Sequence, residues 1–516
     1  MYVIHPVPKR YAWGSPDRLQ QLFNMSEQEG QGPVAEMWFS GHSGSASVLE
    51  LPAETEHQSF LTVPDAIVGN PLGMVGRRSS DEFGPVLPYL FKIISANEPL
   101  SLQVHPVDFE ARAGFNEENA KGIALTDPTR SFKDTNAKNE MVVALEPFEA
   151  VVGFAPRATA LRNLTLVEHP VAVRMVAALQ SDNAGHAGFD VLEPSLKKER
   201  FLQAASSSRS DKSLPQQRHL ATGNPAESGG DSRGASSSST ASFFDFRDAD
   251  VLMPVASAVW HLGTKRIFRA FHAAITAPAE HDAMLLDALR QARGHASNAK
   301  QRLAFDYAIR AAQAFPGDVS ALALLMMNPV SLQEGESVFI PTGTPHAYIH
   351  GTGAEIMTNS DNVLRAGLTV KHKDVPHLLN CLDCKPASPI DPSDTRIGRL
   401  LTRDMVLYRP GVNEFMLIYG HVDAAHTSWP VMDSLAKRYD ALIQQVGGHT
   451  RLPHLGPRIV VCTKGAVRCD TERESRVLHR GQAVFVPASD GWAAVNPVTD
   501  GSASSTGSYV IASTPF

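Results

Sequence analysis

The segment "LSLQVHP" at residues 100–106 places three polar side chains at alternate positions. Ser101, Gln103 and His105 alternate with the apolar residues Leu102 and Val104. Because alternate side chains of a β-strand point to the same face, a hydroxyl, an amide and an imidazole would share one face. Such a row is either a solvent-exposed strand face or half of a metal site whose other ligands lie elsewhere in the chain.

Two further residues could complete a metal site. Glu140 ends a polar turn in "FKDTNAKNEMVVAL" (132–145) and directly precedes an apolar strand, which would put its carboxylate at the rim of a sheet. His346 follows another short strand pattern, in "TGTPHAY". Zinc prefers nitrogen and sulfur ligands and accepts carboxylate. His105, Glu140 and His346 are therefore candidate ligands, although each residue alone is also typical of a hydrogen-bonded or solvated side chain.

A basic segment follows His346. "HAYIHGTGAEIMTNSDNVLRAGLTVKHKD" (346–374) contains a carboxylate, Glu355, and then the cations Arg365, Lys371 and Lys373. Arginine binds phosphate through a bidentate fork and lysine binds it as a point charge. A basic segment just after a candidate metal-bearing strand is what a phosphorylated small substrate would need. A solvated basic loop is the alternative.

The elements that must position these residues are mainly β. Residues 86–155 and 330–370, and the tail from about 386, show short β-branched or aromatic runs between Gly, Pro, Asn and Asp. Between residues 155 and 330 the sequence is typical of helices. In "DAMLLDALRQARGHASNAKQRLAFDYAIRAAQAF" (282–315) apolar residues recur at three- and four-residue steps, and "VSALALLMMNPVSL" continues the pattern until Pro329. We expect a helical domain at 157–328.

Two segments repeat one pattern. "GESVFIP" (335–341) and "GQAVFVP" (481–487) both have a glycine turn, a short apolar strand and a terminating proline. The repeat indicates two related β-barrels or sandwiches, unless a pattern this short recurs by chance. Only the first copy leads to a histidine, so only the first barrel could hold a metal there.

A Ser- and Gly-rich stretch at about 204–242 interrupts the helical region. It has almost no apolar anchors, so it cannot bury enough surface to offset the entropy of ordering. We predict a disordered surface insertion there.

Bulk composition narrows the class of protein. With 516 residues, 43% hydrophobic and 20% charged, the chain is typical of a soluble protein of about two to four domains. Its net charge of −7 disfavours nucleic acid or an anionic membrane as the main partner. We find no membrane-spanning run and no signal-peptide pattern, and we expect a cytoplasmic protein. The four cysteines, with one CxxC pair at Cys381 and Cys384, indicate reduced thiols, although a four-cysteine zinc site is conceivable.

Taken together, these segments resemble the type I mannose-6-phosphate isomerase (phosphomannose isomerase) family of the zinc-dependent cupin superfamily. The resemblance runs in order from the N-terminus to about residue 385. It is carried by "YAWGS", "AEMWFSGHSGS", "LFKIISANEPLSLQVHP", "FKDTNAKNEMVVAL", "FPGDVSALALLMMNPVSLQEGESVFIPTGTPHAYIHG" and "EIMTNSDNVLRAGLTVK".

The resemblance implies a mainly β fold with cupin-type (jelly-roll) β-barrels and an inserted helical domain. Its parts would be a catalytic barrel at 1–156 and 329–385, the helical domain at 157–328, and a C-terminal β domain at 386–516. It also implies an aldose–ketose isomerase that interconverts D-mannose 6-phosphate and D-fructose 6-phosphate through a cis-enediolate, feeds mannose and GDP-mannose metabolism and acts as a monomer.

The family's site residues carry over by position. One Zn²⁺ per chain would be bound by Gln103, His105, Glu140 and His346. Arg365, Lys138 and Glu355 would be catalytic, while Ser101 and Lys371 would bind substrate. Lys138 and Glu355 both stay open as the base that moves the proton between C1 and C2 of the sugar.

The chain departs from the family pattern near Glu140, where Asn139 replaces a common proline, and "GLTVK" replaces a common "GLTPK". The ligand set is intact. Other hypotheses are a cupin that binds a sugar phosphate without turnover, an isomerase of a different sugar phosphate, and a cupin oxygenase. Oxygenases of this kind commonly bind iron through several histidines, whereas a Gln/His/Glu/His set suits zinc better.

Overall fold

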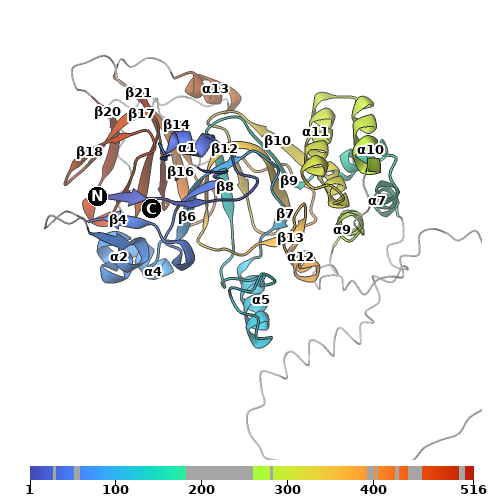
Figure 1. Cartoon of the computed structure of the whole chain (residues 1–516), viewed down its shortest axis with the longest axis horizontal. Coiled ribbons are helices and arrows are strands. Elements are labelled where there is room, and N and C mark those ends of the chain that lie inside the picture. Colours follow the sequence, from blue (N-terminus) through green and yellow to red (C-terminus); the bar gives the residue numbers. More distant parts are fainter. Residues whose placement is uncertain are drawn as a thin grey trace, which may run out of the picture. The chain divides into compact units, whose positions relative to one another are not determined.

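The computed structural model describes residues 1–26, 29, 31–51, 59–181, 260–278, 283–391, 400–401, 405–424, 429–439, 456–498 and 506–516. Met1–Gln180 and His261–Phe516 form one compact unit of antiparallel sheets and helices (Figure 1). The prediction of a mainly β fold with an inserted helical region is confirmed. The jelly-roll form of the barrels and the domain boundaries stay predictions, and the insertion predicted at 204–242 lies outside the described residues.

Within the described residues the first sheet has ten strands, and strand β12 (His346–Thr358) is its centre. β12 pairs antiparallel with β6 (Tyr89–Ala96), β7 (Leu102–Val104), β8 (Glu140–Ala144) and β9 (Phe148–Phe154). The remaining strands are β2 (Val7–Lys9), β3 (Glu36–Phe39), β10 (Met327–Leu332), β11 (Ser337–Ile340) and β13 (Leu364–Gly367). The first sheet therefore contains every strand on which the candidate site depends.

A glycine lets β12 pair on two sides. The first part of β12, from His346 to His350, pairs with β9, and the part from Gly351 to Thr358 pairs with β6 and β8. Gly351 has φ +122°, and a Cβ there would lie 2.3 Å from the carbonyl oxygen of Pro147. Only glycine can adopt this conformation at so close an approach. The bend at Gly351 thus lets one strand join both parts of the sheet.

The second sheet has eleven strands in the described residues and includes strands from both ends of the chain. Val3 in β1 pairs with Val484 in β19, and His5 pairs with Val48 in β4. The strands are β1 (Tyr2–His5), β4 (Val48–Glu50), β5 (Phe60–Thr62), β14 (Leu400–Leu401), β15 (Met405–Tyr408), β16 (Met416–Asp423), β17 (Arg458–Thr471), β18 (Ser475–His479), β19 (Ala483–Val486), β20 (Ala493–Pro497) and β21 (Thr506–Ser513).

The repeated sequence pattern forms the same local structure in each sheet. Gly335 precedes β11 with φ +81°, and Gly481 precedes β19 with φ +86°. A positive φ is sterically costly for other residues, so both positions favour glycine. The predicted unit of glycine turn and short buried strand is confirmed in both copies.

The helical region differs in detail from the prediction. The pattern at 282–315 forms two helices, α10 (Ala283–Gly294) and α11 (Ala299–Ala314), because α10 ends at Gly294 and Asn298 starts α11 by accepting from the Gln301 amide. The next segment is the 3₁₀ helix η3 (Val319–Met326), and Pro329 lies inside β10 at an irregularity in its pairing. Figure 1 shows α6 (Arg157–Leu164), α7 (Pro170–Gln180), α9 (Leu262–Ile275), α10 and α11 on the side of β9 and β10.

Further helices lie in the connections: α1 (Arg18–Leu22), η1 (Ser43–Ser45), α2 (Val63–Gly69), α3 (Pro71–Met74), α4 (Arg77–Phe83), α5 (Asp108–Ala120), α12 (Val375–Cys381), α13 (Pro430–Tyr439) and η5 (Ala488–Asp490). No helix among the described residues has the length and hydrophobicity needed to cross a membrane.

One apolar cluster joins the two sheets. Phe39 and Phe91 of the first sheet stack with ring centroids 5.4 Å apart, and the same cluster includes Leu417 and Phe485 of the second sheet. Burying an aromatic or leucine side chain stabilises a fold by about 1.5–3 kcal/mol. The cluster therefore packs the first sheet against the second.

Candidate metal centre and substrate cavity

Three strands of the first sheet bring the predicted metal ligands together. His346 is the first residue of β12 and lies opposite Gln103 of β7. Glu140 is the first residue of β8 and lies opposite Met357 of β12. His105 follows β7 directly. Residues that are far apart in the sequence thus meet at the ends of neighbouring strands.

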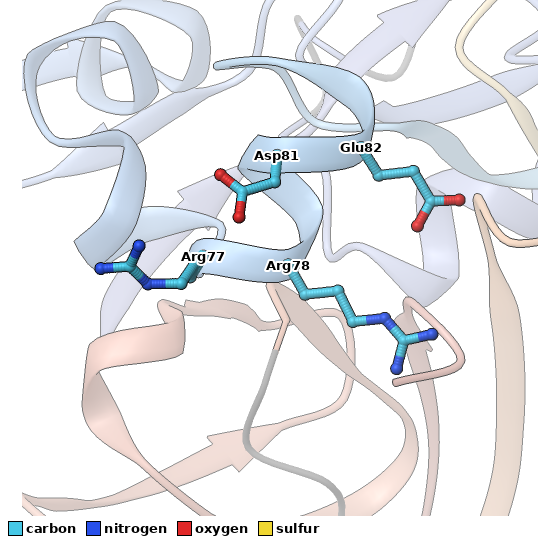
Figure 2. Close-up of a pocket in the computed structure, with 4 residues that line it drawn as sticks. All are labelled: Arg77, Arg78, Asp81 and Glu82. Atoms are coloured by element: carbon cyan, nitrogen blue, oxygen red, sulfur yellow. The ribbon is translucent and has the colours of Figure 1, made fainter.

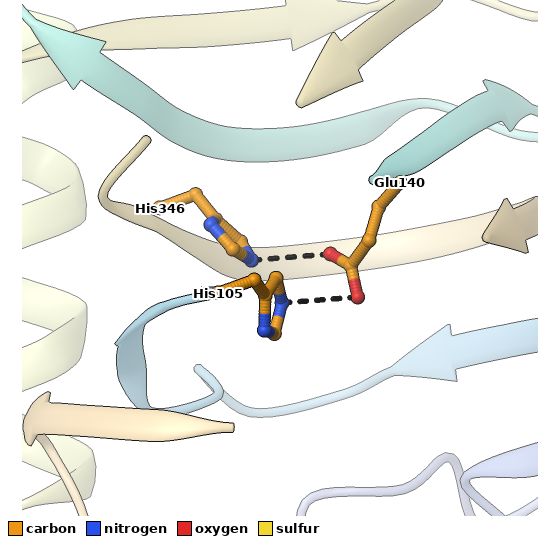
Figure 3. A group of neighbouring side chains, drawn as sticks. All are labelled: His105, Glu140 and His346. Carbon is orange, nitrogen blue, oxygen red and sulfur yellow. Dashed lines mark ion pairs between the residues drawn. The ribbon is translucent and has the colours of Figure 1, made fainter. Parts of the chain in front are cut away.

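Both imidazoles converge on one carboxylate (Figure 3). His105 Nε2 lies 3.1 Å from Glu140 Oε1, and His346 Nε2 lies 3.2 Å from Glu140 Oε2. One possible ligand atom from each of the three residues lies within 4.8 Å of the others, and all three side chains are buried. Among the described residues this is the only such group of His, Cys, Asp and Glu.

Hydrogen bonds fix the tautomer of each imidazole. His105 Nδ1 lies 2.8 Å from the carbonyl oxygen of Asn362, and His346 Nδ1 lies 2.9 Å from that of Thr344. A carbonyl oxygen only accepts, so each Nδ1 carries the proton and each Nε2 presents a lone pair to Glu140. His105 Nε2 and Glu140 Oε2 are buried without a hydrogen-bond partner in the described part of the chain. A centre of facing lone pairs suits a cation, so these residues fit a metal ion.

Burial and charge set the protonation of this centre. Burial lowers the pKa of His105 to about 4, so its imidazole is neutral at neutral pH. Burial alone would raise the pKa of Glu140, but His105 and Lys138 outweigh it and hold that pKa well below its ordinary value. A neutral imidazole beside an ionised carboxylate is the protonation state that metal binding needs.

Gln103 and Ser101 continue the row of polar groups on β7. The Gln103 amide nitrogen lies 3.1 Å from His346 Nε2, and Ser101 donates to Gln103 Oε1 at 3.4 Å. To bind a metal, Gln103 must point its Oε1 toward His346. A rotation of the side-chain amide by about 180° exchanges its oxygen and nitrogen and achieves this. The structure places Gln103 beside the His–Glu–His cluster, as the sequence predicted.

Lys138 also reaches the cluster. Its Nζ lies 3.2 Å from Glu140 Oε1, and its side chain is buried. The intervening Asn139, which stands where the family has proline, accepts a hydrogen bond from the Thr342 amide at 3.2 Å. Its own carbonyl accepts from the Thr358 amide at 3.0 Å. Polar contacts therefore hold the turn that a proline ring would otherwise stiffen.

A cavity of about 880 Å³ opens beside the cluster. Of the predicted site residues, it is lined by Ser101, Gln103, Lys138, Glu140, Glu355, Arg365 and Lys371. His105 and His346 are almost fully buried behind Gln103 and Glu140. The cavity wall also includes Arg310 and Gln313 of α11, so the helical region contributes to it. Cavities of this size commonly hold small molecules.

Lys92 is a charged residue of the cavity that sequence reasoning missed. Its Nζ lies 2.6 Å from Glu355 Oε2 and 2.8 Å from Glu36 Oε1. Burial alone would lower the pKa of Lys92, but the two carboxylates raise it above its ordinary value. Tyr348 donates to the other oxygen of Glu355 at 2.7 Å. A lone lysine inside the apolar strand "YLFKIISA" was the signal that could have identified it.

Arg365 and Lys371 are the two predicted phosphate-binding cations, and both line the cavity. Arg365 belongs to β13 and lies opposite Gln103 of β7. Lys371 lies with its Nζ 5.1 Å from the centre of the Tyr11 ring. Burial lowers the pKa of Arg365, and burial together with the charge of Arg365 lowers the pKa of Lys371. Two cations that face one cavity favour the binding of an anion.

A second hollow and the four cysteines are not part of this site. A second hollow is lined by Arg77, Arg78, Asp81 and Glu82 on α4, and Figure 2 shows these side chains spread along the helix rather than converging. The four cysteines are buried and unpaired, which confirms the predicted free thiols. They form no metal cluster within the described residues, so the conceivable four-cysteine zinc site is not supported.

Comparison with known proteins places this architecture. The family model for the catalytic domain of phosphomannose isomerase type I matches residues 1–157. The mannose-6-phosphate isomerase of Salmonella typhimurium is 27% identical over 484 residues, which cover 93% of each chain. That of Escherichia coli is 28% identical over 384 residues, covering 74% of this chain and 75% of the relative.

Solved structures show the same fold. The crystal structure of a point mutant of phosphomannose isomerase from Salmonella typhimurium has a TM-score of 0.67 at 23% identity, over 100% of both chains. A zinc-bound mannose 6-phosphate isomerase has a TM-score of 0.66 at 23% identity, over 100% of this chain and 99% of that one. From these comparisons we conclude that residues 1–157 match the catalytic domain of type I phosphomannose isomerase and that the chain is similar to full-length mannose-6-phosphate isomerases, whose fold it shares.

Proposed function

We propose that this protein is a zinc-dependent isomerase that interconverts D-mannose 6-phosphate and D-fructose 6-phosphate. The observation that carries the proposal is the buried His105–Glu140–His346 cluster at the edge of a cavity that also presents Arg365 and Lys371. A sugar phosphate needs both features, because its carbonyl end must be activated and its phosphate must be held.

One zinc ion per chain would be held by Gln103, His105, Glu140 and His346. Their donor atoms are those that zinc accepts, and the two imidazoles already present lone pairs. When bound, zinc supplies a Lewis acid that polarises the carbonyl and hydroxyl oxygens of the sugar.

Arg365 and Lys371 bind the phosphate, and Ser101 is a neutral donor to it. Arg365 offers a planar fork and Lys371 a point charge, so together they can offset the two negative charges of a phosphate monoester. Burial and the charge of Arg365 lower the pKa of Lys371, and a bound phosphate would offset the repulsion between the two cations. Arg365 additionally stabilises negative charge that develops during the reaction.

Isomerisation moves a proton between C2 and C1 through a cis-enediolate, and Lys138 and Glu355 are the candidates for this transfer. Both line the cavity: Lys138 lies in the turn before β8, whereas Glu355 belongs to β12. Glu355 is held by Lys92 and Tyr348, which leaves its carboxylate little freedom to turn. We assign proton transfer to this pair of residues.

A coupled assay with mannose 6-phosphate, run on metal-replete protein and after chelation, tests the proposal. Turnover that chelation removes and zinc restores is expected. No turnover with metal-replete protein would leave a sugar-phosphate-binding cupin as the function. Turnover of another sugar phosphate at a higher kcat/KM would assign a different substrate, and iron as the dominant bound metal would contradict the zinc assignment.

A further inference from the structure

The turn after β13 contains a buried residue in a strained conformation. Leu368 has φ +54°, and only one other residue besides the glycines, Asn24, has a positive φ in the described part of the chain. Asparagine tolerates this region, whereas leucine rarely occupies it. Leu368 is fully buried and lines the substrate cavity. A conformation of this kind persists only where surrounding contacts impose it.

Asp318 imposes this conformation through its two carboxylate oxygens. Oδ2 accepts a hydrogen bond from the Leu368 amide at 2.7 Å. Oδ1 accepts from the amide and hydroxyl of Ser320 at 3.0 and 2.6 Å, which caps the start of η3. The carboxylate therefore joins the turn to the first residues of a fully buried helix.

Close packing reinforces the same connection. A Cβ added to Gly367 would lie 1.9 Å from Ser320 Oγ, so the chain can pass η3 only with glycine at this position. The turn that contains Gly367 and Leu368 thus has a single position relative to η3. Asp318 itself is absent from the cavity wall, so it can act on a ligand only through other residues.

The anchored turn lies between the two cations of the cavity. Arg365 precedes it in β13, whereas Lys371 follows it on an exposed segment where Val370 is 98% exposed. Burial, and after it the charge of Arg365, lower the pKa of Lys371. An exposed lysine has high side-chain entropy, so its backbone must be fixed if it is to meet a ligand together with Arg365.

We propose that Asp318 is a positioning residue for phosphate binding: by holding Leu368 in its left-handed conformation, it sets Lys371 opposite Arg365 across the cavity. The inference rests on the proposed function, because it takes Arg365 and Lys371 as the phosphate-binding pair. It adds a residue from the end of the helical region to the recognition of the substrate's phosphate.

The Asp318→Asn variant tests this role. It keeps an oxygen that can cap η3 but presents an NH₂ group, which cannot accept, to the Leu368 amide. A hydrogen bond to a charged group corresponds to roughly a tenfold or larger change in affinity. We expect KM for mannose 6-phosphate and the inhibition constant of inorganic phosphate to rise together by about tenfold. The kcat value and the zinc content should change by less than about twofold, because the metal centre is separate.

Two controls separate positioning from a general loss of structure. Ser320→Ala removes the hydroxyl that donates to Asp318 but keeps the hydrogen bond from the Leu368 amide. It should therefore leave KM near the wild-type value. In a Lys371→Ala background, Asp318→Asn should raise KM little further, because both changes remove the same interaction. If the double variant raises KM by the product of the two single effects, the proposal is overturned.

If Asp318→Asn fails to fold, Asp318→Glu replaces it, since a longer carboxylate keeps the charge but cannot reach both partners in the same geometry. Normal KM and normal phosphate inhibition in a folded variant would overturn the role of Asp318 and leave the isomerase assignment intact. Should the wild-type protein turn over no sugar phosphate, the isomerase assignment fails. Calorimetric binding of inorganic phosphate to wild type and variant then still decides the role of Asp318.

Discussion

The carbonyl oxygen of Asn362 lies 2.8 Å from Nδ1 of His105, and the Asn362 side chain holds the loop that leads to Glu140. Its Oδ1 accepts from the Lys133 amide at 2.7 Å, and its Nδ2 donates to the Asn136 carbonyl at 3.0 Å. One fully buried residue therefore sets the tautomer of one ligand and the approach of another.

The first prediction follows from this relationship. Asn362→Ala keeps the backbone carbonyl that contacts His105 but removes the side-chain hydrogen bonds that hold the loop before Glu140, so zinc binding should weaken by about tenfold. Chelator competition measures the affinity. Asn298→Ala is the matched control, because it removes the cap of α11 and lowers stability away from the cluster. Equal zinc affinity in the Asn362 variant and the wild type would contradict the role of Asn362.

Replacing a central ligand should have a larger effect. His346→Ala removes one of two imidazole ligands and leaves the buried carboxylate of Glu140 with a single imidazole partner. We expect the purified variant to contain less than about a tenth of the wild-type zinc, and to lose activity with it. Elemental analysis beside the coupled assay checks this outcome. A zinc-replete variant would show that His346 is not a ligand.

Loss of a phosphate-binding cation should reduce activity without reducing the zinc content. Arg365→Ala is expected to keep its zinc and to lose about two orders of magnitude or more in kcat/KM, since the arginine is assigned to both binding and charge stabilisation. Lys373→Ala is the matched control, because Lys373 has the same charge in the same segment but is not part of the cavity wall. A near-normal rate in the Arg365 variant would refute the phosphate assignment.

Glu355 offers a test of proton transfer. Glu355→Gln keeps the shape of the side chain and an oxygen that can accept from Tyr348, but removes the charge opposite Lys92. We expect kcat to fall by about a hundredfold or more with zinc retained, which is the usual size of a general acid–base contribution. Exchange of the C2 hydrogen with heavy water should slow in parallel. Unchanged exchange would assign the transfer to Lys138 alone.

A pH-dependent contribution to stability is expected at α12. His377 lies 2.7 Å from Asp374 and 3.4 Å from Glu117, and its hydrogen bond to Asp374 raises the pKa of His377 above its ordinary value of about 6.5. A raised pKa means that folding favours the protonated form. The stabilisation is complete below about pH 6.5 and is lost as the pH rises through the higher folded-state pKa.

The free energy of unfolding should therefore decrease between pH 6 and pH 8 more steeply in the wild type than in His377→Gln. Urea denaturation at both pH values measures the difference. His295→Gln serves as the control at an exposed histidine outside this cluster. Parallel curves for the wild type and the His377 variant would show that the ion pair contributes no pH dependence.

Local sequence patterns predicted much of the candidate site, because the proposed ligands lie in strands or next to them. Gln103, His105, Glu140 and His346 lie beside short apolar runs, and strand alternation is visible in a single sequence. Lys92 was missed because its partners, Glu36 and Glu355, come from two other strands, and no local pattern shows that they meet. Pairing between distant strands depends on the whole sheet.

The same reason limits the prediction of secondary structure. The apolar periodicity of 282–315 is continuous, yet one helix ends at Gly294 and Asn298 caps the next, so local hydrogen bonds outweigh periodicity there. The left-handed turn at Leu368 also lacks a local signal, since the residue type disfavours it and a distant carboxylate stabilises it. Tertiary contacts therefore determine the details on which the proposed phosphate site depends.

The pairing of β1 with β19 has a consequence for biosynthesis. Tyr2 and Phe485 are partners in one sheet, although almost the whole chain separates them. Closing so long a loop is entropically costly, and a ribosome delivers the N-terminus first. Until residues 483–486 emerge, β1 has no partner on that edge and exposes unpaired backbone groups. We therefore expect the second sheet to be completed only after synthesis has passed this strand, and the nascent chain to be most prone to aggregation before then.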